Sequence, residues 1–98
     1  MSLQYVDVTD LYEAAFLITQ GNRIEEIQCI PVSDMVSCRI TLAGAEVRTA
    51  QSVYENRKAC VNVHEFRSAY HQVNSFVHEA KKNYDRQLRQ LRKTGGVL

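Results

Sequence analysis

Residues 63 to 92 carry an apolar repeat that only a long helix brings onto one face. The repeat steps by three or four positions, which is the period of an α-helix. Its members are Phe66, Tyr70, Val73, Val77, Ala80 and Tyr84. Ala69 and Phe76 widen the repeat, and Leu88 and Leu91 continue it. A helix of about 30 residues is about 45 Å long, so the rest of this short chain packs along only part of it.

Local signals place the ends of this helix. Asn62 is a favourable N-cap, and Glu65 stands three residues later, as in a capping box. The run Thr94-Gly95-Gly96 favours a stop. The sequence therefore predicts a helix from residue 63 to about residue 92.

The preceding residues predict a small sheet with two shorter helices. Residues 3 to 8 favour a strand, and Asp10 with Glu13 starts a helix over 10 to 20 that Gly21 stops. Two β-prone runs and a second helix follow, and their ranges are 24 to 32, 35 to 43 and 45 to 56. The predicted order is β-α-β-β-α-α. We expect an α+β fold with a three-stranded sheet and helices on one face, in which a right-handed crossover makes the first strand parallel to a neighbour.

The two central strands predict a hairpin that turns at Ser33-Asp34. In the second strand, alternation places four residues on the inner face, which are Val36, Cys38, Ile40 and Leu42. The register then pairs Ile27 with Ile40 and Cys29 with Cys38. We interpret both cysteines as small buried side chains in a reducing compartment. A disulfide, a metal ligand pair and a reactive thiolate remain as alternatives.

Composition favours one soluble domain over residues 1 to 98. The chain is 45% hydrophobic, with one Pro and four Gly, which is ordinary for a globular protein. Its longest apolar run, residues 14 to 18, is too short to cross a membrane. The first residues lack the pattern of a signal peptide, and three cysteines do not suit a disulfide framework. We expect a cytoplasmic protein.

Charge is distributed unevenly along the chain. Residues 1 to 36 hold one arginine against six acids, whereas residues 37 to 98 hold eleven Lys and Arg against five acids. Either the two parts pack against each other, or a basic surface meets an acidic partner or nucleic acid. We expect the segment 79–98 to be a basic extension of the last helix with a short flexible end. Within it, helical spacing aligns four cations, which are Lys82, Arg86, Arg89 and Lys93.

The three histidines, His64, His71 and His78, are seven residues apart. Seven residues span about 10.5 Å of helix, so the three side chains cannot meet at one ion. Helical geometry also places them opposite the apolar repeat, where we expect them to face solvent. The chain has no glycine-rich phosphate loop, nucleophile elbow or HExxH motif. We therefore expect no catalytic residue, no metal and no cofactor, and a protein that is not an enzyme.

Residues 7 to 17, with Gly21 and Ile24, resemble a family of small uncharacterised bacterial, archaeal and phage proteins that is classed as a domain of unknown function. Tyr54-Glu55-Asn56 and residues 61 to 66 are similar to the closing part of that family. The resemblance covers residues 5 to 77. It implies an Ala-rich helix, a hairpin and two closing helices, and it supplies no catalytic residues.

These patterns favour a protein-interaction or accessory module. We expect a homodimer formed through the end of the last helix, where Tyr84, Leu88 and Leu91 extend beyond a small sheet. The alternative is a nucleic-acid-binding accessory protein that uses the aligned cations.

Overall fold

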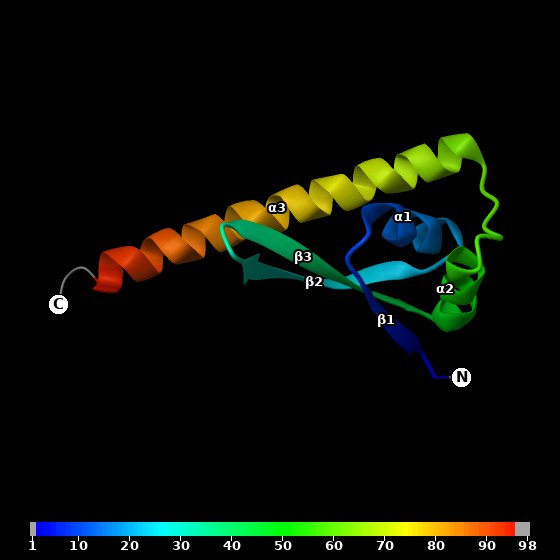
Figure 1. Cartoon of the computed structure of the whole chain (residues 1–98), viewed down its shortest axis with the longest axis horizontal. Helices are drawn as coiled ribbons and strands as arrows, with labels where there is room; N and C mark the ends of the chain where they lie inside the picture. Colours follow the sequence, from blue (N-terminus) through cyan, green and yellow to red (C-terminus); the bar gives the residue numbers. More distant parts are fainter. Residues whose placement is uncertain (1, 96–98) are drawn as a thin grey trace.

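The computed structural model describes residues 2 to 95 and the side chains of residues 2 to 91. The elements in chain order are β1 (Gln4–Val8), α1 (Leu11–Thr19), β2 (Arg23–Val32), β3 (Met35–Gly44), α2 (Val47–Glu55) and α3 (Val63–Gly95). The predicted order and the α+β class are confirmed. Figure 1 shows α1 and α3 over the same side of the sheet, with α2 at the end of the molecule where α3 begins.

The sheet has the strand order β1-β3-β2, and both outer strands are antiparallel to β3. The prediction that the first strand is parallel to a neighbour is therefore wrong. β1 and β2 do run in the same direction, but β3 lies between them. The connection through α1 leaves one strand position open between β1 and β2, and β3 occupies that position. This is a split β-α-β arrangement.

The hairpin has the predicted register. Ile27 pairs with Ile40, and Cys29 pairs with Cys38. The turn consists of Ser33 and Asp34, and Ser33 adopts a left-handed φ of 55°. The alternation of apolar and polar residues was therefore sufficient to predict the pairing of β2 with β3, although the turn contains no glycine.

A β-bulge interrupts β2 near its start. Ile24 pairs with Leu42 and Glu26 pairs with Thr41, so Glu25 is the extra residue. The bulge allows Ile24 and Ile27, three positions apart, to pack against the same core, which regular alternation would forbid. Glu25 and Glu26 are both exposed.

Capping side chains start α1 and α3 as predicted. The backbone N–H of Tyr12 donates to Asp10 Oδ1 over 2.9 Å. The N–H groups of His64 and Glu65 donate to Asn62 Oδ1 over 3.0 and 3.1 Å. These bonds satisfy donors that have no partner within their own helix.

The other helix limits differ slightly from the prediction. Gly21, with a φ of 90°, follows α1 as the expected stop, while α2 is one or two residues shorter at each end than predicted. α3 continues to Gly95, past the predicted end at residue 92. The flexible end that we expected falls on residues 96 to 98, outside the described residues.

The core lies between the inner face of the sheet and the two helices α1 and α3. Its buried members are Val8, Ala14, Ala15, Phe16, Leu17, Cys38, Ile40, Leu42, Val47, Ala69, Val73 and Val77. The ring of Tyr12 stacks on Tyr70 at a centroid distance of 5.0 Å, which ties α1 to α3. Phe76 is 47% exposed. The prediction that it widens the buried repeat is therefore wrong, because its side of α3 is uncovered at this position.

Candidate interaction surfaces of the last helix

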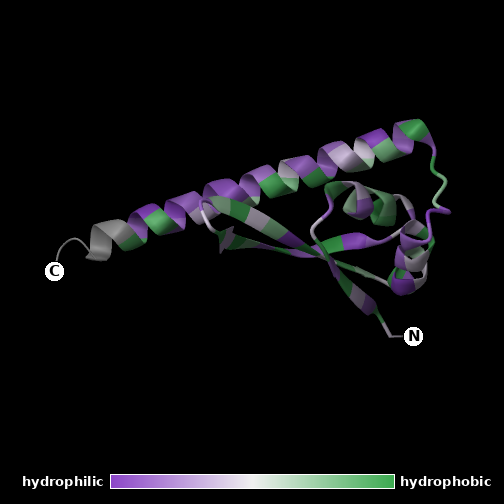
Figure 2. Cartoon of the chain, viewed as in Figure 1, coloured by the Kyte–Doolittle hydropathy of each residue, from purple (hydrophilic) through white to green (hydrophobic). Residues whose placement is uncertain are grey.

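The apolar repeat of α3 continues past the core towards the C-terminus. We call Tyr84, Leu88 and Leu91 the apolar stripe. Tyr84 and Leu88 are half-buried, whereas Leu91 is 67% exposed. Figure 2 shows hydrophobic segments of α3 that continue beyond the tip of the β2–β3 hairpin. The structure thus places the three predicted dimer residues on one side of α3 and leaves the outermost one in solvent.

A groove lies between the edge strand β2 and the second half of α3. Its volume is about 460 Å³, and its lining residues are Ile27, Gln28, Cys29, Ile30, Ala80, Asn83, Tyr84 and Gln87. No formal charge lines it. Tyr84 belongs to both the groove and the apolar stripe, so the two form one continuous surface. The sequence did not predict this groove, because it depends on how α3 crosses the sheet.

The predicted cations lie on the opposite side of α3. Helical geometry at about 100° per residue places Lys82, Arg86 and Arg89 away from Val73 and Val77, and all three are exposed. The fourth predicted contact, Lys93, has a side chain outside the described residues. The cations that can be placed therefore share one side of the helix, as predicted.

The histidines lie on the same side, and all three are exposed, which confirms that they face solvent. We define the outward ridge as His64, Ser68, His71, Ser75, His78, Lys82, Arg86 and Arg89. It extends for about 37 Å along α3. The ridge itself carries no acid, and Glu79 and Asp85 flank it on either side.

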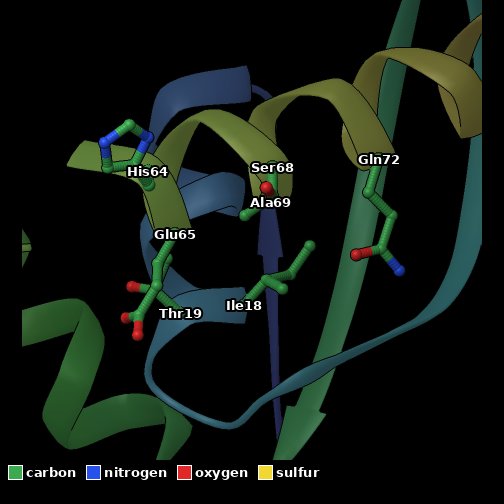
Figure 3. A pocket seen from close by; sticks show the side chains of 7 residues that line it. All are labelled: Ile18, Thr19, His64, Glu65, Ser68, Ala69 and Gln72. Carbon is green, nitrogen blue, oxygen red and sulfur yellow. The ribbon is translucent and has the colours of Figure 1, made fainter. Parts of the chain in front are cut away.

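A shallow groove of about 520 Å³ separates the C-terminal end of α1 from the first turns of α3. Its lining residues are Ile18, Thr19, His64, Glu65, Ser68, Ala69 and Gln72. Figure 3 shows that the His64 ring and the Glu65 carboxylate point in different directions. The hydroxyl of Thr19 donates to the carbonyl of Phe16 over 2.6 Å. The polar groups here do not converge on one point, so this groove is a poor candidate for a catalytic site.

Over the described part of the chain, no group of three or more His, Cys, Asp or Glu side chains is arranged to hold a metal ion. His71 and His78 line a common open groove with Lys81 and Leu11. A lysine cation beside two histidines disfavours a bound metal cation there.

The cysteines of the hairpin meet across the strands. Sγ of Cys29 lies 3.6 Å from Sγ of Cys38. Burial, followed by the hydrogen bond with Cys38, raises the pKa of the Cys29 thiol to about 11. Both thiols are free, as is the exposed Cys60.

Acidic side chains gather where α1 begins and α2 ends. The hydroxyl of Tyr54 donates to Asp10 Oδ2 over 3.0 Å. Burial, with smaller contributions from Asp10 and Glu55, raises the pKa of Glu13. The sequence did not predict this cluster, because residues 44 positions apart meet only in the folded chain.

Internal ion pairs among the described side chains do not neutralise the uneven charge of the chain. Arg23 and Glu25, within β2, form an ion pair of 3.2 Å. Among the side chains of residues 2 to 91, no ion pair joins the basic part of α3 to the acidic part of the chain before residue 37. Lys82, Arg86 and Arg89 are exposed and form no ion pair with the described side chains.

Within the described residues, no helix is both long enough and apolar enough to cross a membrane. No protein-family model, curated protein or solved structure matches the chain. The family resemblance of residues 5 to 77 thus stays a prediction, and the candidate surfaces rest on geometry and chemistry alone.

Proposed function

We propose that the chain is a non-enzymatic interaction module that self-associates through the apolar stripe. The observation that carries the proposal is the 67% exposure of Leu91 on a helix that extends past its own sheet. Burying a leucine side chain contributes about 1.5–3 kcal/mol, so a second copy that covers the stripe gains free energy. The free thiols suit a reducing compartment, and we place the module in the cytoplasm.

The charge distribution around the apolar stripe supports a second copy as its partner. On one flank, Asn83 and Gln87 are uncharged. On the other flank, Lys81 and Asp85 carry opposite charges. Lys82, Arg86 and Arg89 of the outward ridge point away from the apolar stripe. Two copies can therefore join their stripes while Lys82, Arg86 and Arg89 stay outside the interface, although the segment from Glu79 to Lys93 has six cations and two acids.

The test is the mass in solution of the Leu91→Asp variant. Leu91 is largely exposed within one chain, so the substitution spares the fold and places a charge in the shared interface. Sedimentation velocity should show a dimer for the unaltered chain and a monomer for the variant. Ser75→Asp adds the same charge on the outward ridge and should remain dimeric. A monomeric unaltered chain, or a dimeric Leu91→Asp variant, would refute this interface.

The outward ridge favours a second function, the binding of nucleic acid. It is a line of cations, histidines and serines without an acid, along one side of α3. Such a surface can follow phosphates by charge, with an affinity that falls as salt rises. Because ridge and stripe lie on opposite sides of α3, a dimer would leave both ridges accessible.

Fluorescence anisotropy with labelled single- and double-stranded DNA and RNA tests this second function. Binding should weaken steeply between low and physiological salt, and the Arg86→Glu/Arg89→Glu variant should lose it. The matched control is Arg48→Glu/Arg57→Glu, which changes the net charge equally on exposed residues outside α3. Equal loss in both variants would indicate attraction by total charge, without a specific ridge.

A further inference from the structure

We infer that Cys29 and Cys38 form a redox modification site, at which a small-molecule disulfide oxidises the two thiols to a cross-strand disulfide. This inference is independent of the proposed function. It starts from the 3.6 Å contact between the two sulfur atoms and from their direct pairing in the β2–β3 ladder.

The hairpin places this pair at a favourable position in the ladder. Val32 and Met35 flank the two-residue turn, so they form a hydrogen-bonded pair. Hydrogen-bonded and non-hydrogen-bonded pairs alternate along an antiparallel ladder. Counting back from Val32, Pro31 and then Cys29 fall in non-hydrogen-bonded pairs. Pro31 suits such a position because it has no N–H. Cα atoms of such pairs are about 4.5 Å apart, within the range that disulfides span.

The two thiols differ in access. Cys38 is buried at 7% exposure, whereas Cys29 is half-buried and lines the groove between β2 and α3. A small disulfide can therefore reach Cys29 first. The Cys29 thiolate attacks one sulfur of the reagent, forms a mixed disulfide and releases one thiolate. The Cys38 thiolate then attacks Cys29 Sγ, closes the Cys29–Cys38 bond and releases the second thiolate. Two protein thiols are oxidised and one small disulfide is reduced to two thiols.

The raised pKa of Cys29 sets the speed of the site. A pKa of about 11 leaves little thiolate at neutral pH, so oxidation is slow there and accelerates as the pH rises towards that value. The pair is therefore suited to slow locking of the hairpin under sustained oxidation and unsuited to rapid sensing.

The experiment uses the full chain with Cys60→Ser, which removes the third thiol. The protein is equilibrated with glutathione and glutathione disulfide in defined ratios, quenched with acid and digested with trypsin. Cys29 and Cys38 then lie on one peptide, residues 24 to 39. Mass spectrometry should show that this peptide loses two hydrogens. The folded chain should oxidise at a glutathione disulfide level roughly tenfold or more below that needed in concentrated urea.

Two single variants test the order of attack. Cys38→Ser should stop at a glutathione adduct on Cys29, and Cys29→Ser should react far more slowly because Cys38 is buried. The inference is overturned if the folded chain needs more glutathione disulfide than the unfolded chain. It is also overturned if a glutathione adduct on Cys29 persists while Cys38 is present.

Discussion

At the scale of single residues, Asn22 joins the end of α1 to the end of β3. Its side-chain Nδ2 donates to the carbonyl of Leu17 over 2.8 Å, and the residue is 8% exposed. Gly44 provides the space for this side chain, because a Cβ at that position would overlap with Asn22 Oδ1. A buried amide thus depends on a glycine 22 positions later.

Gly44→Ala should lower the free energy of unfolding by about 1–3 kcal/mol, because the added methyl displaces the Asn22 amide from its hydrogen bond. Urea denaturation measures the change. In an Asn22→Ala background the overlapping atom is gone, so the same substitution should cost much less. Equal costs in the two backgrounds would show that backbone strain at residue 44, and not Asn22, is responsible.

The pKa of Glu13 predicts a pH-dependent penalty. Burial raises this pKa above its ordinary value of 4.5 in the folded chain. The charged carboxylate therefore destabilises the fold at neutral pH, and the penalty fades as the pH falls through the raised pKa towards 4.5. Glu13→Gln should raise the urea midpoint near pH 7 and have no such effect below about pH 4. The exposed Glu26→Gln serves as the control, and an equal gain there would contradict the assignment to burial.

At the scale of elements, the rotation of α3 about its axis decides which side chains are buried. Val77 is 7% exposed and its neighbour Phe76 is 47% exposed. Val77→Ala should therefore destabilise the fold by about 1–3 kcal/mol, and Phe76→Ala should cost less despite removing more atoms. Thermal or urea unfolding measures both. The reverse order would mean that α3 is rotated relative to the core.

Local chemistry explains why the elements themselves could be predicted. Asp10 and Asn62 are good caps, and alternation in residues 35 to 43 fixes an inner and an outer face. The partner of β1 could not be predicted, because strand order depends on contacts between distant parts of the chain. The predicted end of α3 at residue 92 was early, because a glycine such as Gly95 can stand within a helix at a cost of only about 1 kcal/mol relative to alanine.

The candidate surfaces also differ in whether local spacing or contacts between distant parts of the chain determine them. Helical spacing alone aligned Lys82, Arg86 and Arg89 on one side of the last helix, and all three are exposed on α3. The groove beside Cys29 could not be predicted, because it requires the angle at which α3 crosses β2.

At the scale of the whole molecule, the chain is elongated. Its radius of gyration is 16.0 Å and its longest extent is 54 Å, whereas a compact domain of this length has a radius of gyration of about 12.6 Å. A helix of 33 residues, about 50 Å long, accounts for the difference. The buried residues of α3 end at Val77, so the last part of this helix contributes more to surface than to core.

Removal of residues 89 to 98 should therefore separate folding from association. The shortened chain retains Val77, Tyr84 and Leu88, and we expect it to fold with a melting temperature close to that of the full chain at high dilution. The full chain should melt at higher temperature as its concentration rises, because dimerisation stabilises the folded state by mass action. The shortened chain, which lacks Leu91, should show no such dependence. Circular dichroism melts over a wide range of concentrations measure both. If the shortened chain still melts at higher temperature when concentrated, self-association uses another surface, and the free edges of β1 and β2 become the next candidates.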